Sequence, residues 1–203
     1  NLREPEDAFR EACLLLKKEP SSLGIRAMVV DEAQDISSAG FELIRAAVAP
    51  VENDLFIVGD AHQRIYRHKV VLGRVGIEVR GRSRSLKVNY RTTDEIRHWA
   101  CAQLEGCTVD DLDGNTDSLR GYRSLTHGDK PDIIESSTLQ DDVSHIQTIL
   151  RQLQDDGMEL RQVCITARTN DDVEAILRQL QSDYAERGVN LVKIGSNWAF
   201  LTA

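Results

Sequence analysis

The apolar and polar positions of this chain predict strands that alternate with helices. Short apolar runs have the length and β-branched content of buried strands, and they lie at 26–30, 55–60, 86–90, 132–135, 162–166 and 190–194. Apolar residues that recur every three or four positions predict helices at 5–18, 38–49, 139–155 and 171–187, the last with Asn170 as its N-cap, and Thr92 and Glu95 open a further helix at capping-box spacing. This alternation is typical of an α/β fold with a mostly parallel sheet flanked by helices.

Two segments interrupt the alternation. Residues 61–85 are irregular and rich in Gly and Arg, with a candidate short strand at 77–79. Residues 106–130 have the composition of a loop, with many Gly, Asp and Ser residues. The Gly-Arg-Ser stretch at 81–86 is the best candidate for a boundary between domains. We therefore expect two α/β units, which would comprise residues 1–82 and 83–203.

The composition is that of an ordinary globular protein, with 41% hydrophobic and 29% charged residues among 203. No apolar stretch approaches the roughly 20 residues needed to span a bilayer, and the N-terminus lacks a signal-peptide pattern. The cysteines are scattered without a disulfide framework, which favours a reducing, cytoplasmic setting. Metal binding by His98, Cys101 and Cys107 is disfavoured because they lack zinc-type spacing.

The charge distribution is uneven. The chain has a net charge of −8, yet residues 64–91 hold nine Lys or Arg and one acid, Glu78, so this window carries +8 and the remainder −16. Such a window is either a solvated basic face or an anion-binding surface. The interpretation as an anion-binding surface is favoured.

The stretch MVVDEAQD places Asp31 and Glu32 where a predicted strand leaves the core. In nucleotide hydrolysis an acid at a strand end holds Mg²⁺. A second carboxylate beside it can orient or deprotonate the attacking water. The alternative is that both acids only complement the dipole of the following helix.

Two further strand ends carry polar groups. In IVGDAHQRIY, Gln63 follows the strand-terminal Asp60, and its amide can hydrogen-bond a γ-phosphate. In NYRTT, Tyr90 can stack on a base and Arg91 has the position of an arginine finger. The alternatives are a turn residue for Gln63, a core aromatic for Tyr90 and a surface ion-pair partner for Arg91.

The set VVDEAQD…IVGDAHQRIY…LKVNYRTT, in this order, resembles the UvrD/Rep/PcrA-type superfamily I DNA helicases, with counterparts of the Walker B segment and the third and fourth helicase motifs. The later stretch VCITARTNDDVEAILRQL is similar to the second RecA-like domain of that family. The resemblance covers roughly residues 25–195. It implies RecA-like sheets flanked by helices, from parts of two P-loop NTPase-type domains.

The resemblance also implies roles in ATP hydrolysis. Asp31 would hold Mg²⁺, Glu32 would be the catalytic base and Gln34 would lie near the attacking water. Gln63 would contact the γ-phosphate and couple it to DNA, and Arg91 would be the arginine finger.

The resemblance further implies a contact between Tyr90 and the adenine of ATP. Single-stranded DNA would be touched by the segment after Gln63, whose side chains supply stacking and charge. This segment comprises Arg64, Tyr66, Arg67, His68 and Lys69. His68 stands where the family usually has a base-stacking tryptophan.

The chain contains no G-x-x-x-x-G-K-[ST] phosphate loop, and the last helicase motifs are missing as well. We expect a truncated interior piece of an ATP-dependent DNA helicase, inactive alone, whose parent moves on single-stranded DNA. The alternative is a non-catalytic RecA-like relic that binds DNA or protein.

Overall fold

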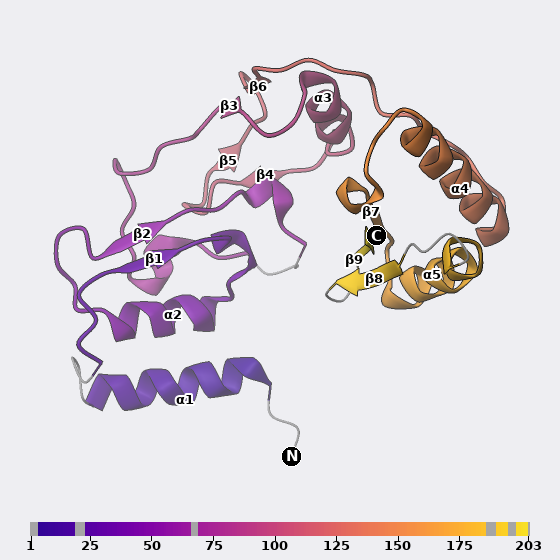
Figure 1. The fold of residues 1–203 in the computed structure, drawn as a ribbon. Helices are drawn as coiled ribbons and strands as arrows, with labels where there is room; N and C mark the ends of the chain where they lie inside the picture. Colours follow the sequence, from indigo (N-terminus) through magenta and orange to yellow (C-terminus); the bar gives the residue numbers. More distant parts are fainter. Residues whose placement is uncertain (1–3, 19–22, 66–68, 186–189, 195–197, 203) are drawn as a thin grey trace. The chain divides into compact units, whose positions relative to one another are not determined.

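A computed structural model describes residues 4–18, 23–65, 69–185, 190–194 and 198–202. The chain divides into two compact units, residues 1–131 and 132–203, each of which combines helices with small sheets (Figure 1). The helices are α1 (Pro5–Lys18), α2 (Ser38–Ala47) and α3 (Asp94–Ala102) in the first unit, and α4 (Leu139–Asp155) and α5 (Asn170–Ala185) in the second. Among the described residues, none of the helices has the length and apolar character needed to cross a bilayer.

Among its described residues, the first unit contains three two-stranded sheets. Strands β1 (Met28–Val30) and β2 (Leu55–Ile57) pair in parallel, and β3 (Val88–Asn89) pairs in parallel with β6 (Arg123–Ser124). Strands β4 (Val109–Asp110) and β5 (Thr116–Asp117) form an antiparallel hairpin. The segment 106–130, predicted to be a loop, therefore contributes three short strands, whereas residues 77–79 form none.

One face of the β1–β2 pair forms the core of the first unit. Val30 on β1 is buried, and Phe41 on α2 has no exposed surface. Figure 1 shows α2 between this pair of strands and α1. Val29 and Phe56 point away from this core and are 74% and 65% exposed, as expected for side chains that alternate across strands.

Short 3₁₀ turns follow the strands of the first unit. They are η1 (Ala33–Asp35) after β1, η2 (Ala61–Gln63) after β2 and η3 (Leu72–Val75) further along. The buried Leu72 and Ile77 belong to the same core cluster as Val30 and Phe41.

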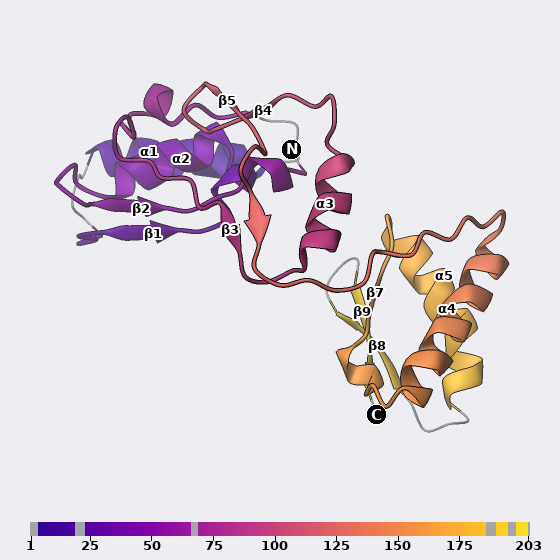
Figure 2. The same ribbon diagram turned by 90° about the horizontal axis from the view of Figure 1, so that it is seen from above.

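The second unit packs α4 and α5 against an apolar cluster. Its fully buried members include Val143, Leu150, Leu180 and Tyr184. The turn η4 (Leu160–Gln162) leads into β7 (Cys164–Thr166), and β8 (Asn190–Ile194) and β9 (Trp198–Thr202) complete a sheet in the order β7-β9-β8 (Figure 2).

The prediction of a mostly parallel sheet is wrong for the second unit, because β9 pairs antiparallel with both neighbours. Strands as close in sequence as β8 and β9 can pair only in this way, since parallel pairs need a long crossover. The predicted strand at 132–135 is also wrong. Ile133 and Ile134 are 69% and 47% exposed there, and these residues pair with no strand in the part of the chain that the structure describes.

Two predicted helix starts are displaced by one residue. Thr93, not Thr92, is the N-cap of α3, and its hydroxyl accepts the Ile96 N–H. Glu95 instead accepts the Gly128 N–H, so it is not the partner in a capping box. At α5 the capping hydroxyl belongs to Thr169, which accepts the Asp172 N–H.

Candidate functional site

The polar segments that follow β1 and β2 lie side by side. The Val58 N–H donates to the Val30 carbonyl at 2.8 Å, and the Ala33 N–H donates to the Val58 carbonyl at 3.0 Å. The parallel ladder therefore continues past both strands and joins residues 31–35 to residues 59–63. The carboxyl-terminal edge of such a pair is where open α/β sheets bind ligands.

Gln34 links the two segments through a buried side chain that is 3% exposed. Its Oε1 accepts the Asp60 N–H at 2.9 Å, and its Nε2 donates to Glu32 Oε2 at 2.7 Å. Only one orientation of the amide satisfies both partners, because an N–H needs an acceptor and a carboxylate needs a donor. Gln34 therefore links the two polar segments through a buried side chain.

Glu32 has a strained backbone. Its φ of 50° and ψ of 42° are left-handed values, which cost a residue with a side chain about 1–3 kcal/mol. The Glu32 N–H donates to Asp31 Oδ1 at 2.9 Å, and both side chains are exposed. Backbone strain of this kind is concentrated at functional sites.

Asp31 and Glu32 neither cap helix α2 nor lie in its first turn. The N-cap of α2 is Ser37, whose hydroxyl accepts the Gly40 N–H at 3.3 Å, and the first turn of α2 contains no acid. The alternative based on the helix dipole is thus not supported for Asp31 and Glu32.

Asp60 organises the second segment. Its Oδ1 accepts the His62 N–H at 3.0 Å and lies 3.2 Å from His62 Nδ1, while its Oδ2 accepts from Gln63 Nε2 at 2.8 Å. The exposed Gln63 amide keeps its second N–H for another acceptor. Sequence reasoning gave no role to Asp60 or His62, although Asp60 carries the same signal as Asp31, an acid at a strand end.

Arg64 is not a free surface cation. Its Nη1 and Nη2 donate to Asp110 Oδ2 at 2.6 Å and Oδ1 at 3.0 Å, and its side chain is 9% exposed. The hydrogen bonds and charge of Asp110 raise the pKa of Arg64, and the same contact lowers the pKa of Asp110. Of the other predicted DNA contacts, Lys69 is exposed, and Tyr66, Arg67 and His68 lie outside the described residues.

Tyr90 and Arg91 follow β3, on a different sheet from β1 and β2. Tyr90 is 76% exposed and is not a core aromatic. The Arg91 N–H donates to Asn89 Oδ1 at 2.8 Å, and its exposed guanidinium has no hydrogen bond or ion pair to any described residue. Among the described residues, no hydrogen bond or ion pair joins Tyr90 or Arg91 to the acids after β1.

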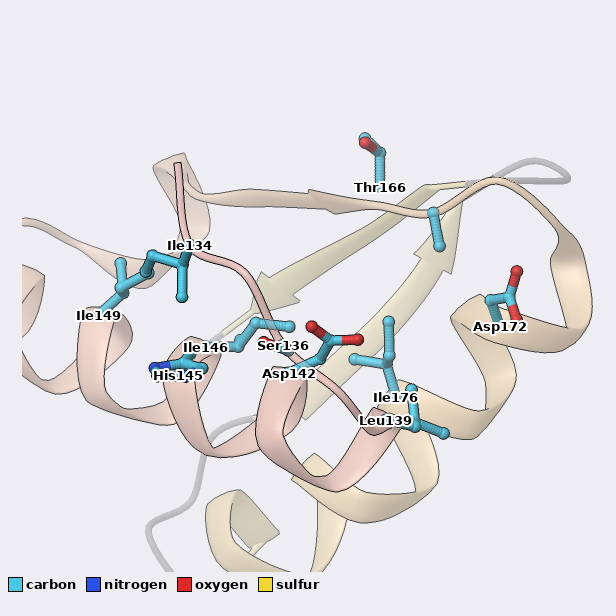
Figure 3. A pocket seen from close by; sticks show the side chains of 11 residues that line it. Ile134, Ser136, Leu139, Asp142, His145, Ile146, Ile149, Thr166, Asp172 and Ile176 are labelled. Carbon is cyan, nitrogen blue, oxygen red and sulfur yellow. The ribbon is translucent and has the colours of Figure 1, made fainter. Parts of the chain in front are cut away.

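A cavity of about 530 Å³ lies in the second unit, among α4, α5, β7 and the segment before α4. Figure 3 shows Ile146 and Ile176 there together with the carboxylates of Asp142 and Asp172. None of the predicted site residues lines it, and neither does any lysine or arginine. Its apolar and acidic walls do not suit a phosphate group.

Two family models match the chain. The model of the UvrD/REP helicase N-terminal domain matches residues 7–70, and the model of the UvrD-like helicase C-terminal domain matches residues 84–198, more than half of the chain. No individual curated protein matches it. The family resemblance inferred from the motifs is thereby confirmed.

The contact between the two polar segments yields a prediction for Gly59. A Cβ at this position would lie 2.9 Å from Ala33 Cβ and 3.0 Å from Gln34 Oε1. Gly59→Ala should therefore force the segments apart and lower the free energy of unfolding by about 1–3 kcal/mol, measured by urea denaturation. Gly73→Ala is the matched control, because a Cβ there meets nothing within 4 Å. Equal losses in the two variants would contradict the close contact.

Proposed function

The chain belongs to the UvrD-like helicases, and from this premise we propose that it is part of the motor core of an ATP-dependent DNA helicase. The motor hydrolyses ATP with Mg²⁺ and moves on single-stranded DNA. The observation that carries the proposal is the hydrogen-bonded series Glu32–Gln34–Asp60–Gln63 at the ends of two neighbouring parallel strands. The proposal includes two RecA-like domains that meet near residue 82. This boundary is supported by the interval between the two family matches, the first ending at residue 70 and the second beginning at residue 84, although the compact units divide at residue 131.

The residues present fit a magnesium–nucleotide complex. No cluster of three or more metal-binding side chains occurs among the described residues. Mg²⁺ on a nucleotide does not require one, since it is held by one or two carboxylates together with phosphate oxygens. Asp31 supplies an exposed carboxylate with one oxygen occupied by the Glu32 N–H. We assign Mg²⁺ to Asp31, and the bound ion would neutralise charge on the phosphates.

Glu32 is the general base in this proposal. Its carboxylate accepts a proton from the water whose oxygen bonds to the γ-phosphorus as the bond to ADP breaks. The hydrogen bond from Gln34 fixes one Glu32 oxygen and leaves the other for the water. The second N–H of Gln63 donates to a γ-phosphate oxygen, so that Asp60 orients this contact.

Arg91 completes the site from the proposed second RecA-like domain, which begins near residue 83. An exposed guanidinium without a partner among the described residues is available to approach the γ-phosphate when nucleotide is bound. Tyr90, beside it and largely exposed, offers a face to the adenine ring.

Single-stranded DNA is the proposed partner of the segment after Ile65. Lys69 is exposed, and the basic window continues with exposed Arg74, Arg80 and Arg82. Phosphate contacts from such residues provide affinity without sequence specificity. A cytoplasmic setting is consistent with four free cysteines, of which Cys107 and Cys164 are exposed.

The decisive experiment is Glu32→Gln in the complete gene product. The amide keeps an oxygen for the Gln34 N–H but cannot take a proton, so turnover should fall by about 10²-fold or more while ATP still binds. Steady-state ATPase rates and ATP titration by calorimetry measure the two effects. Glu42→Gln, on the exposed side of α2, is the control. A wild-type protein without ATPase activity would favour the alternative, a non-catalytic module that binds DNA or protein.

The chain of 203 residues alone is expected to be inactive, since it has no phosphate-loop motif.

Arg91→Ala should reduce turnover by roughly 10²-fold with a much smaller change in ATP affinity, because a finger stabilises charge that develops in the transition state. Arg91→Lys should recover little, since a lysine lacks the planar fork. ATPase rates at saturating single-stranded DNA test both variants. Arg123→Ala, exposed on the neighbouring β6, is the control. Wild-type turnover in Arg91→Ala would show that Arg91 is only a surface residue.

DNA binding should be weak and should decrease with salt, because phosphate contacts release counterions. Replacing Arg67 and Lys69 together with alanine should reduce the log–log salt slope by about 1.4 if both contact phosphate on a single strand. Fluorescence anisotropy with a labelled oligonucleotide measures the slope in the complete gene product. The control replaces Lys17 and Lys18 on α1, which removes the same charge from another surface. An identical slope in the two double variants would exclude the proposed DNA contact.

A further inference from the structure

The β4–β5 hairpin holds the turn that presents Gln63. Arg64 directly follows Gln63, and its bidentate contact with Asp110 joins residues 46 positions apart in the sequence. The Leu72 N–H also donates to the Leu112 carbonyl, in the loop of the hairpin, at 3.0 Å. A bidentate contact between a guanidinium and a carboxylate restricts orientation as well as distance.

The hairpin also approaches the other side of Gln63, through His62. The His62 side chain is 9% exposed, and its Nδ1 lies 3.9 Å from Asp117 Oδ2 on β5. The ring of Tyr122 meets the His62 ring edge-on, with centroids 6.2 Å apart and planes at 65°. Both sequence neighbours of Gln63 are therefore held by residues that follow α3.

The surroundings of Arg64 explain why this contact fixes a position rather than simply adding stability. A buried ion pair contributes little net stability, because desolvation offsets the attraction between the charges. Asp35, on the first polar segment, adds a second carboxylate near Arg64. Its buried Oδ1 and the buried Arg64 Nε have no hydrogen-bond partner among the described residues. Within the described ranges, the hydrogen bonds of the Arg64 guanidinium thus go to Asp110, and Asp35 contributes only the attraction of its charge.

We propose that Asp110 is a positioning residue for ATP hydrolysis, which acts through Arg64 to hold Gln63 in place for the γ-phosphate. The inference rests on the proposed function and deepens it. The hairpin lies outside the helicase motifs identified in the sequence, so it adds a positioning element to the motor.

The test compares Arg64→Lys with Arg45→Lys in the complete gene product. Arg45 forms a second buried pair in the same unit, with its Nη2 2.6 Å from Asp54 Oδ2 and side chains 17% and 9% exposed. Both variants keep the positive charge but lose the planar guanidinium, which can donate two hydrogen bonds to one carboxylate. Arg64→Lys should lower kcat for DNA-stimulated ATP hydrolysis by about tenfold or more, with a smaller change in KM, since misplacement of a positioning group slows chemistry. Arg45→Lys should leave kcat unchanged.

Amide hydrogen exchange of residues 59–65 supplies a readout that does not depend on activity. The Gln63 N–H donates to the Asp60 carbonyl at 3.0 Å, and its exchange should become faster in Arg64→Lys but not in Arg45→Lys. Unchanged exchange, or equal kcat losses in the two variants, would overturn the proposal. If wild-type protein lacks ATPase activity, the proposed function fails, while exchange still reports whether the hairpin holds the turn. Should Arg64→Lys not fold, Asp110→Asn carries the same comparison against Asp54→Asn.

Discussion

The buried amide of Gln34 is the constraint on which the rest of the site depends. A buried polar group must keep its hydrogen bonds, because an unpaired one costs about 1–3 kcal/mol. Gln34 meets this requirement only when Glu32 and the Asp60 N–H lie on either side of it. The two polar segments must then stay in contact, which is possible because Gly59 has no side chain at the point of closest approach. The left-handed backbone of Glu32 lies in the same arrangement, and its side chain accepts the Gln34 hydrogen bond.

Local patterns predicted the helices well. The helices predicted at 5–18 and 139–155 have these bounds in the structure, because apolar periodicity and turn signals belong to the helix itself. Strand pairing was predicted less well. Residues 132–135 have the pattern of a buried strand but pair with no strand in the described part of the chain. The antiparallel order β7-β9-β8 depends on β7 pairing with β9, on the far side of α5 in the sequence. A strand is defined by its partners, which a single apolar run does not reveal.

The same distinction applies to the site. The acids after β1 and the amide after β2 were predicted because their positions follow from strand ends alone. The linking position of Gln34 and the contact between Arg64 and Asp110 were not. Arg64 looked like one member of a basic window, and only the fold brings Asp110 to it across 46 residues. Charge counted along the sequence therefore overestimated the free positive surface by at least one residue.

The two kinds of site residue differ in how they are held, and this difference fits the chemistry proposed for them. Glu32, Asp60 and Gln63 are joined by hydrogen bonds within one sheet edge, so their arrangement exists before any ligand binds. Preorganised groups need no reorganisation during the reaction. Arg91 is exposed and without a partner among the described residues. A group that acts only in the transition state gains from this arrangement, because a firm contact elsewhere would have to be broken before it reached the phosphate. If the proposed function holds, the motor would combine a preorganised edge with an exposed cation, and hydrolysis would depend on the event that brings them together.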